Sequence, residues 1–248
     1  MTRLVRAELA KLRTTRTAWG VTAGMAAFAV LTVVANVTSA GRQGAPPLSA
    51  ASLPDLVGAP ATLLSGAVLL LGILSMTGEL RHHTITQTFL VTPNRGRVVA
   101  AKLITHALAG LAIGVTTLAV TTAVAVAWLT AKGVTVSLLD GRLGRVLAGT
   151  LLAAGLCGLV GVGVGALVRN QVAALVGVLV WALLVEGLLL NLLHAPGLGR
   201  WLPAAAAAAL TSPGGAHLSR WGGGLLFAAY GLGFALLGTR FVVRRDVT

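Results

Sequence analysis

Few side chains in this sequence could do chemistry, and most of them lie between residues 78 and 102. This stretch holds the acid Glu79, the adjacent histidines His82 and His83, and four of the nineteen Lys and Arg residues of the chain. Adjacent histidines diverge on a helix, so His82 and His83 cannot share a metal ion there. The stretch predicts a short, partly polar helix between two apolar spans; the alternative is an inert loop that only sets topology.

The rest of the sequence contains no pattern typical of an enzyme. The other three histidines have no ligand partner three or four residues away, so no metal site is predicted; they are His106, His194 and His217. The dipeptide Gly-Lys does not occur, which excludes a phosphate-binding loop of the form GxxxxGK[ST]. We therefore expect that the chain is not an enzyme, binds no cofactor and has no catalytic residue.

Glu186 is the one acid within a long apolar run, WALLVEGLLLNLL. A charge at the centre of a bilayer costs about 2.5–3.5 kcal/mol on insertion scales, and such residues commonly mark a functional site. Two interpretations follow. The carboxyl group either titrates in a transport path or makes a structural hydrogen bond to a neighbouring helix.

The composition indicates an integral membrane protein. Hydrophobic residues make up 56% of the 248 residues and charged residues 10%, whereas soluble domains carry about 25% charged residues. The net charge of +13 reflects the preference of Lys and Arg for the cytoplasmic ends of membrane spans. We expect no nucleic-acid partner.

The apolar pattern predicts an all-α protein with a single transmembrane domain, residues 1–248. Six runs are long enough to cross the roughly 30 Å hydrocarbon core as helices. They lie at residues 18–37, 56–76, 103–129, 146–168, 172–193 and 222–243. A shorter apolar run, Ala204 to Leu210, lies between Pro203 and Pro213 and predicts a re-entrant or interfacial helix.

An even number of spans places both termini on the same side. With the termini inside, the inner segments hold thirteen Lys and Arg residues and the outer segments hold six. The positive-inside rule then predicts a multi-pass protein of the cell membrane with both termini cytoplasmic. The preference for Arg over Lys, with abundant Ala, Gly and Val, suggests a bacterial source with GC-rich DNA.

Residues 2–17 predict an amphipathic helix. One face is apolar and carries Val5, Leu9 and Leu12. The other face is basic and carries Arg3, Arg6 and Arg13. Glu8 can pair with Lys11, three residues along. This pattern favours a helix in the cytoplasmic membrane interface; the alternative is a solvated basic tail that only sets topology.

The stretch from Glu79 to Lys102 carries a resemblance to a known family. It has an acid after span two, the base Arg81, a helix start at Thr84-Ile85, a turn at Thr92-Pro93-Asn94-Arg95, and Lys102 at the start of span three. With the six spans, this order resembles the permease subunit of type-2 ATP-binding-cassette exporters. His83 stands where the family tends to have Gly.

The resemblance implies a division of labour. Two permease subunits would rest on separate ATPase subunits that bind ATP and Mg. We favour a homodimer, and a heterodimer with a sister permease stays open. A coupling helix at residues 80–91 would dock on the ATPase. The residues implied in this coupling are Glu79, Arg81, His82, His83, Thr84, Ile85, Thr88, Pro93 and Arg95.

The function expected is export of a hydrophobic or amphipathic substrate, such as a drug, an antibiotic or a lipid-like molecule. Two other hypotheses stay open at this point. One is an ion- or proton-coupled secondary transporter that uses Glu186, and the other is a non-transporting membrane anchor or sensor. Membrane lipid surrounds the chain in each case.

Overall fold

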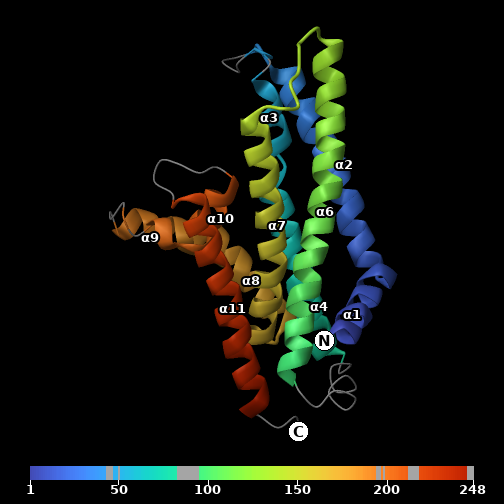
Figure 1. The fold of residues 1–248 in the computed structure, drawn as a ribbon. Coiled ribbons are helices and arrows are strands. Elements are labelled where there is room, and N and C mark those ends of the chain that lie inside the picture. Colours follow the sequence, from blue (N-terminus) through green and yellow to red (C-terminus); the bar gives the residue numbers. More distant parts are fainter. Residues whose placement is uncertain are drawn as a thin grey trace.

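The computed structural model describes residues 1–42, 47–49, 51–82, 95–193, 197, 199–211 and 218–244. Within these ranges the chain forms helices and no strand. Figure 1 shows the long helices α4, α6 and α7 side by side, with α1 and the last turn of α11 at the same end of the bundle. We call this the terminal end, and the opposite end the distal end.

The helices follow one another in the order α1 (Thr2–Thr14), α2 (Arg16–Ser39), α3 (Ser52–Gly58), α4 (Ala61–Arg81), α6 (Arg95–Ala131), α7 (Gly141–Val168), α8 (Gln171–Val180), the π-helix η1 (Trp181–Val185), α9 (Glu186–Leu193), the 3-10 turn η2 (Gly199–Trp201), α10 (Pro203–Thr211) and α11 (Arg220–Arg244). Among the described residues, six stretches are long and apolar enough to cross a membrane. Each of the six predicted spans overlaps one of them, so the prediction of an all-α, six-span protein is confirmed.

α7 lies at the centre of the fold and packs against α4, α6, α10 and α11. Glycines on α7 make this close packing possible. Gly158 lies against the backbone of His106 on α6, and Gly161 lies against the backbone of Leu69 on α4. A Cβ atom at either glycine would collide with a main-chain carbonyl of the neighbouring helix. Small residues let the backbones of membrane helices approach closely, and these glycines do so at α7.

The predicted short helix between spans five and six is α10. Its inner side is buried at Ala206, Ala209 and Leu210, and the Leu210 carbonyl lies against Gly149 of α7. Gly149 is eight residues along α7 from Gly141, or about 12 Å at 1.5 Å per residue. α10 and the start of α11 thus lie part-way along the bundle, as Figure 1 shows.

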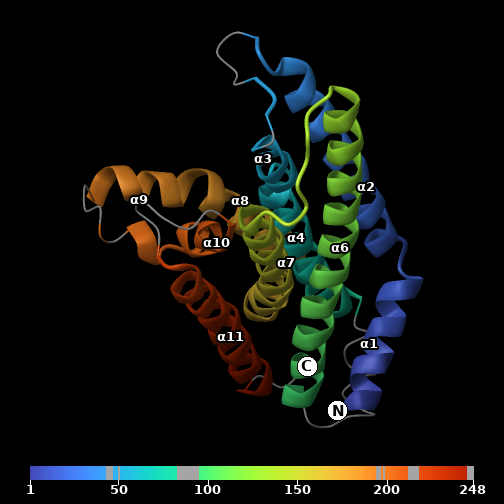
Figure 2. The ribbon, with the colours of Figure 1, turned by 45° about the horizontal axis from the view of Figure 1, so that its top comes forward.

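Span five departs from the direction of the bundle. Figures 1 and 2 both show α8 and α9 running across the axis of α7. The π-helix η1 lies between them, a deviation that the apolar pattern could not predict. Most side chains of this segment are exposed, including Leu183 at 76% and Val172 at 66%.

We predict that Gly161→Ala destabilises the protein, because the new Cβ would meet the Leu69 carbonyl, which is backbone and cannot turn away. Overpacking of this kind costs about 1–3 kcal/mol. The measurement is thermal unfolding of the purified protein in detergent.

Gly144→Ala, on the same helix, is the matched control. Its Cβ would meet nothing within 4 Å, and alanine favours a helix over glycine by up to about 1 kcal/mol. The two variants should therefore shift the melting temperature in opposite directions. Equal shifts would show that the α4–α7 contact does not limit stability.

Candidate functional site

Two acids and two bases meet at the terminal end of the bundle. We call Glu8, Lys11, Glu79 and Lys102 the terminal charge cluster. Glu8 and Lys11 lie on α1, Glu79 lies in the last turn of α4, and Lys102 lies in the second turn of α6. Residues 79 and 102 flank the 83–94 segment along the chain, so the cluster joins α1 to both helices that border that segment.

The local sequence explains why the side chains of α1 face inward. On this helix Leu4, Val5, Leu9 and Leu12 are half-buried. Residues three or four apart share a face of a helix, so Glu8 lies on this same inner side. α1 packs along α6, and this contact places Glu8 against Lys102.

The four groups form a closed ring of ion pairs. Lys102 Nζ lies 2.7 Å from Glu8 Oε2 and 2.8 Å from Glu79 Oε1. Lys11 Nζ lies 2.7 Å from Glu8 Oε1 and 2.9 Å from Glu79 Oε1. Each base therefore donates to both acids, and the ring as a whole is neutral.

Burial differs sharply among the four side chains. The side chain of Lys102 is fully buried, that of Glu8 is 6% exposed, that of Glu79 is 16% exposed and that of Lys11 is 47% exposed. A buried ammonium group is stable only when carboxylates satisfy it, because its desolvation is costly. Glu8 and Glu79 supply those carboxylates to Lys102. The half-exposed Lys11 contributes less, because solvent screens its pairs.

The pKa values of the two α1 groups follow from this geometry. Burial by itself would raise the pKa of the Glu8 carboxyl, but the ammonium groups of Lys102 and Lys11 outweigh it and hold that pKa below its usual value. Burial by itself would lower the pKa of the Lys11 amine, but hydrogen bonds to Glu8 and Glu79 raise it. Both groups are therefore held in their charged forms at neutral pH.

The structure places the other predicted coupling residues only in part. Arg81 ends α4, and its Nη1 lies 3.4 Å from Gln171 Oε1 at the start of α8. His82 follows and is exposed. His83, Thr84, Ile85, Thr88 and Pro93 lie outside the described residues, as does the side chain of Arg95. The coupling helix at residues 80–91 therefore stays a prediction.

The predicted N-terminal helix is present as α1, and its arginines Arg3, Arg6 and Arg13 are exposed. The i,i+3 pair of Glu8 and Lys11 is present. The position of α1 in a membrane interface stays a prediction. Sequence reasoning missed the partner of Glu8 on α6. The available signals were Glu8, an acid on the apolar side of the helix, and Lys102, a lysine at the start of a span. The sequence does not indicate that these two residues, 94 positions apart, form a pair.

Glu186 makes a structural contact. Its Oε1 accepts a hydrogen bond of 2.8 Å from the backbone N–H of Ala204, in the first turn of α10. The residue is 5% exposed. Free N–H groups and the positive end of the helix dipole at a helix N-terminus favour a carboxylate. Of the two interpretations of Glu186, this contact agrees with a structural hydrogen bond to a neighbouring helix.

The sequence matches the profile of a known protein family. The profile of the ABC-2 family transporter protein matches residues 4–185. This match covers most of the chain, α1 through η1. The chain belongs to the ABC-2 transporter family. A comparison with curated proteins found no match.

Membership makes the chain an ABC transporter permease and a multi-pass membrane protein. It also implies partnership with an ABC ATPase subunit. In this permease the terminal charge cluster lies at the end of α4 and near the start of α6.

We predict that Lys102→Met strongly destabilises the permease. It leaves the carboxylates of Glu8 and Glu79 buried without their main partner, and breaking a buried pair in this way costs about 3–5 kcal/mol. The measurement is the melting temperature in detergent, with the exposed Lys132→Met as the control.

The double variant Lys102→Met/Glu8→Gln tests the cause. It removes one uncompensated charge, so it should recover part of the lost stability. A double variant that is less stable than Lys102→Met would contradict the assignment of Lys102 as a buried cation held by Glu8.

We predict a pH dependence that reports the Glu8 carboxyl. Its folded pKa is depressed, so its contribution to stability is fully present above the unfolded pKa of about 4.3 and is lost as the pH falls through the folded pKa. The melting temperatures of wild type and Glu8→Gln should differ by a constant amount between about pH 5 and pH 9, and this difference should shrink below about pH 4. A difference that persists undiminished to pH 3 would show that Glu8 is not stabilised as a carboxylate.

Proposed function

We propose that this permease exports a hydrophobic or amphipathic substrate, such as a drug, an antibiotic or a lipid-like molecule, with ATP hydrolysed by a separate subunit. In this proposal the chain lies in the cell membrane of a bacterium with both termini cytoplasmic, so the terminal end faces the ATPase. The chain itself is not an enzyme and binds no cofactor, and ATP and Mg belong to the ATPase.

The terminal charge cluster is the observation that supports this proposal. The ion pair between Glu79 and Lys102, 2.8 Å long, joins α4 to α6, the two helices that border residues 83–94. Lys102 also holds Glu8 of α1 at 2.7 Å. A force that the ATPase exerts on residues 83–94 would therefore act on α1, α4 and α6 together.

The packing of the bundle extends this path into the membrane. α4 and α6 both pack on α7, and the glycine contacts there join backbone to backbone. Tightly packed helices move as units and do not deform continuously. Movement at the segment would then shift helix positions along the bundle, which is what alternating access requires.

The second permease subunit would be another copy of this chain. α8, η1 and α9 present an apolar surface that no described part of the same chain covers, with Leu183, Leu184 and Leu188 each more than 60% exposed. Lipid or a second subunit can cover such a surface in a membrane. A homodimer is the simpler assembly of a single permease chain.

We predict that affinity purification of the tagged chain from its native membrane recovers a soluble protein with the GxxxxGK[ST] motif. In that complex, Glu79→Gln and Arg81→Ala should each lower the substrate-stimulated ATPase rate by roughly fivefold or more, the lower end of typical coupling effects. The unstimulated rate should be retained, because the ATPase active site is on the partner. The readout is phosphate release from the reconstituted complex.

Lys132→Ala serves as the matched control, because Lys132 is exposed at the distal end beyond α6. Variants that retain wild-type stimulation would remove Glu79 and Arg81 from coupling. Recovery of no such ATPase across several detergents would overturn the proposal itself.

A further inference from the structure

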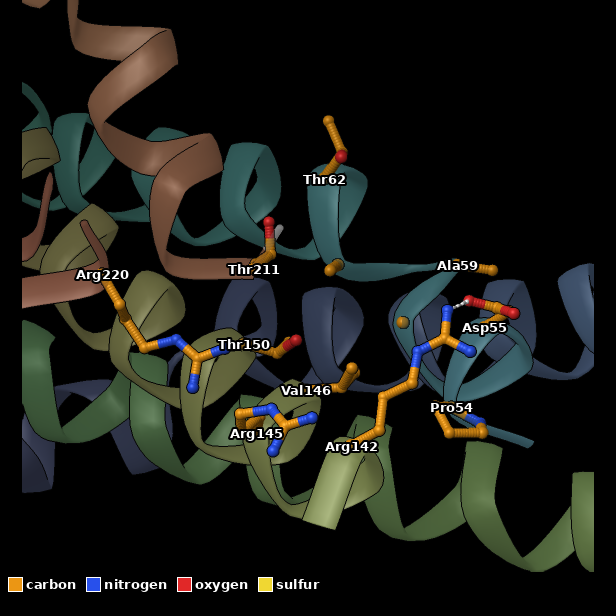
Figure 3. A pocket seen from close by; sticks show the side chains of 12 residues that line it. Pro54, Asp55, Ala59, Thr62, Arg142, Arg145, Val146, Thr150, Thr211 and Arg220 are labelled. Atoms are coloured by element: carbon orange, nitrogen blue, oxygen red, sulfur yellow. Dashed lines mark hydrogen bonds and ion pairs between the residues drawn. The ribbon is translucent and has the colours of Figure 1, made fainter. Parts of the chain in front are cut away.

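A cavity of about 530 Å³ lies in the distal half of the bundle, where α3, α4, α7, α10 and α11 meet. Three arginines line it, namely Arg142, Arg145 and Arg220, together with one acid, Asp55. Figure 3 shows Arg220 and Thr150 toward one side of the cavity and the Arg142–Asp55 pair toward the other. None of these residues belongs to the terminal charge cluster.

The positive charge of this cavity is only partly compensated. Asp55 is engaged by Arg142, with Oδ1 and Nη2 2.6 Å apart. Across the part of the chain that the structure describes, neither Arg145 nor Arg220 has a carboxylate within ion-pair distance. Three guanidinium groups and one carboxylate leave the lining with a net charge of +2.

Two polar atoms of the lining are buried and lack a partner among the described residues. They are the hydroxyl oxygen of Thr150, a residue that is fully buried, and Nε of Arg220. Among the buried helix threonines, Thr77 and Thr121 each donate to the carbonyl four residues earlier, whereas Thr105 and Thr117 lack a partner among the described residues as Thr150 does. A buried donor without an acceptor is costly, so these two groups point to an acceptor that the described residues do not supply.

Helix ends of both polarities surround the cavity. α4 begins at Ala61 without a side-chain cap, and Thr62 in its first turn lines the cavity. α11 begins at Arg220 itself. Helix N-termini carry partial positive charge and free N–H groups that favour anions. The C-terminal ends of α3 at Gly58 and of α10 at Thr211 also line the cavity and have the opposite polarity. The preference for an anion therefore depends on the arginines.

The depth of the cavity strengthens these interactions. Leu210, next to Thr211, lies against Gly149 of α7, part-way along the bundle. Arg142 and Arg145 are exposed, whereas Arg220 is half-buried, so the charge of Arg220 is screened less than a charge on a surface in water. An uncompensated guanidinium is costly there, and an oxyanion would relieve that cost.

We propose that this cavity binds a phosphate-type oxyanion. Guanidinium groups hold phosphate oxygens in a bidentate manner, and a net charge of +2 suits a group with one to two negative charges. The volume falls within the range of about 300–1,000 Å³ that is typical of small-molecule sites, so it admits the headgroup of an anionic phospholipid as well as free phosphate. The inference goes beyond the proposed function, because binding to the permease does not depend on how transport is energised.

The test measures thermal unfolding of the full-length permease in an uncharged detergent at constant ionic strength. One arm titrates inorganic phosphate, a second titrates dihexanoyl phosphatidylglycerol, and a third titrates the phosphatidylcholine of the same chain length. A saturable rise in melting temperature is expected with phosphatidylglycerol and not with phosphatidylcholine. A rise with inorganic phosphate at similar concentration assigns the site to a free anion, and a rise with phosphatidylglycerol alone assigns it to a lipid headgroup.

The variants locate the site. Arg145→Gln and Arg220→Gln should each weaken binding about tenfold or more, and Thr150→Val should weaken it by a smaller factor, as expected for loss of one hydrogen bond to a charged group. Without ligand, Arg220→Gln should melt no lower than wild type, because it removes an uncompensated cation. Arg220→Lys, which keeps the charge, should retain part of the binding.

Arg42→Gln is the control, because it removes one exposed distal arginine that does not line this cavity. Its affinity should equal that of wild type. Equal affinities for Arg145→Gln/Arg220→Gln and Arg42→Gln would overturn the proposal. So would the absence of a saturable response to both phosphate and phosphatidylglycerol.

Discussion

The burial of one ammonium group constrains the terminal end of this permease. Lys102 is fully buried and bonds to carboxylates from two other helices, Glu8 on α1 and Glu79 on α4. A buried cation without such partners would be too costly to keep charged. The positions of α1, α4 and α6 are therefore coupled, because moving α1 or α4 away from α6 removes one of the two carboxylates that compensate Lys102.

The middle of the bundle depends on a different constraint, which is steric. Gly158 and Gly161 bring α7 against the backbones of α6 and α4. In lipid no hydrophobic effect drives helices together, so association depends on close van der Waals packing. The absence of a Cβ atom at these positions makes that packing possible. Charge thus fixes the helix ends, while shape fixes the helix centres.

The two ends of the molecule handle charge in opposite ways. At the terminal end, two lysines and two glutamates form a neutral ring. At the distal end, Arg145 and Arg220 line a cavity in which the described acid, Asp55, is already paired with Arg142. A neutral ring of ion pairs suits a contact that holds α1, α4 and α6 together. An excess of positive charge with unsatisfied donors suits a place where a ligand binds.

The sequence by itself determined the class of the protein: six apolar runs, no nucleotide-binding loop, and Glu79, Glu8 and Lys11 as polar groups of interest. Length and hydrophobicity act locally along the chain, so these features can be read without a fold. The pairing of Lys102 with Glu8, the crosswise course of α8 and α9, the contact of Glu186 with α10 and the distal arginine cavity were decided only by the tertiary structure. These features depend on segments that are separated along the sequence. The packing of helices on α7, rather than any local pattern, determines which of these segments meet.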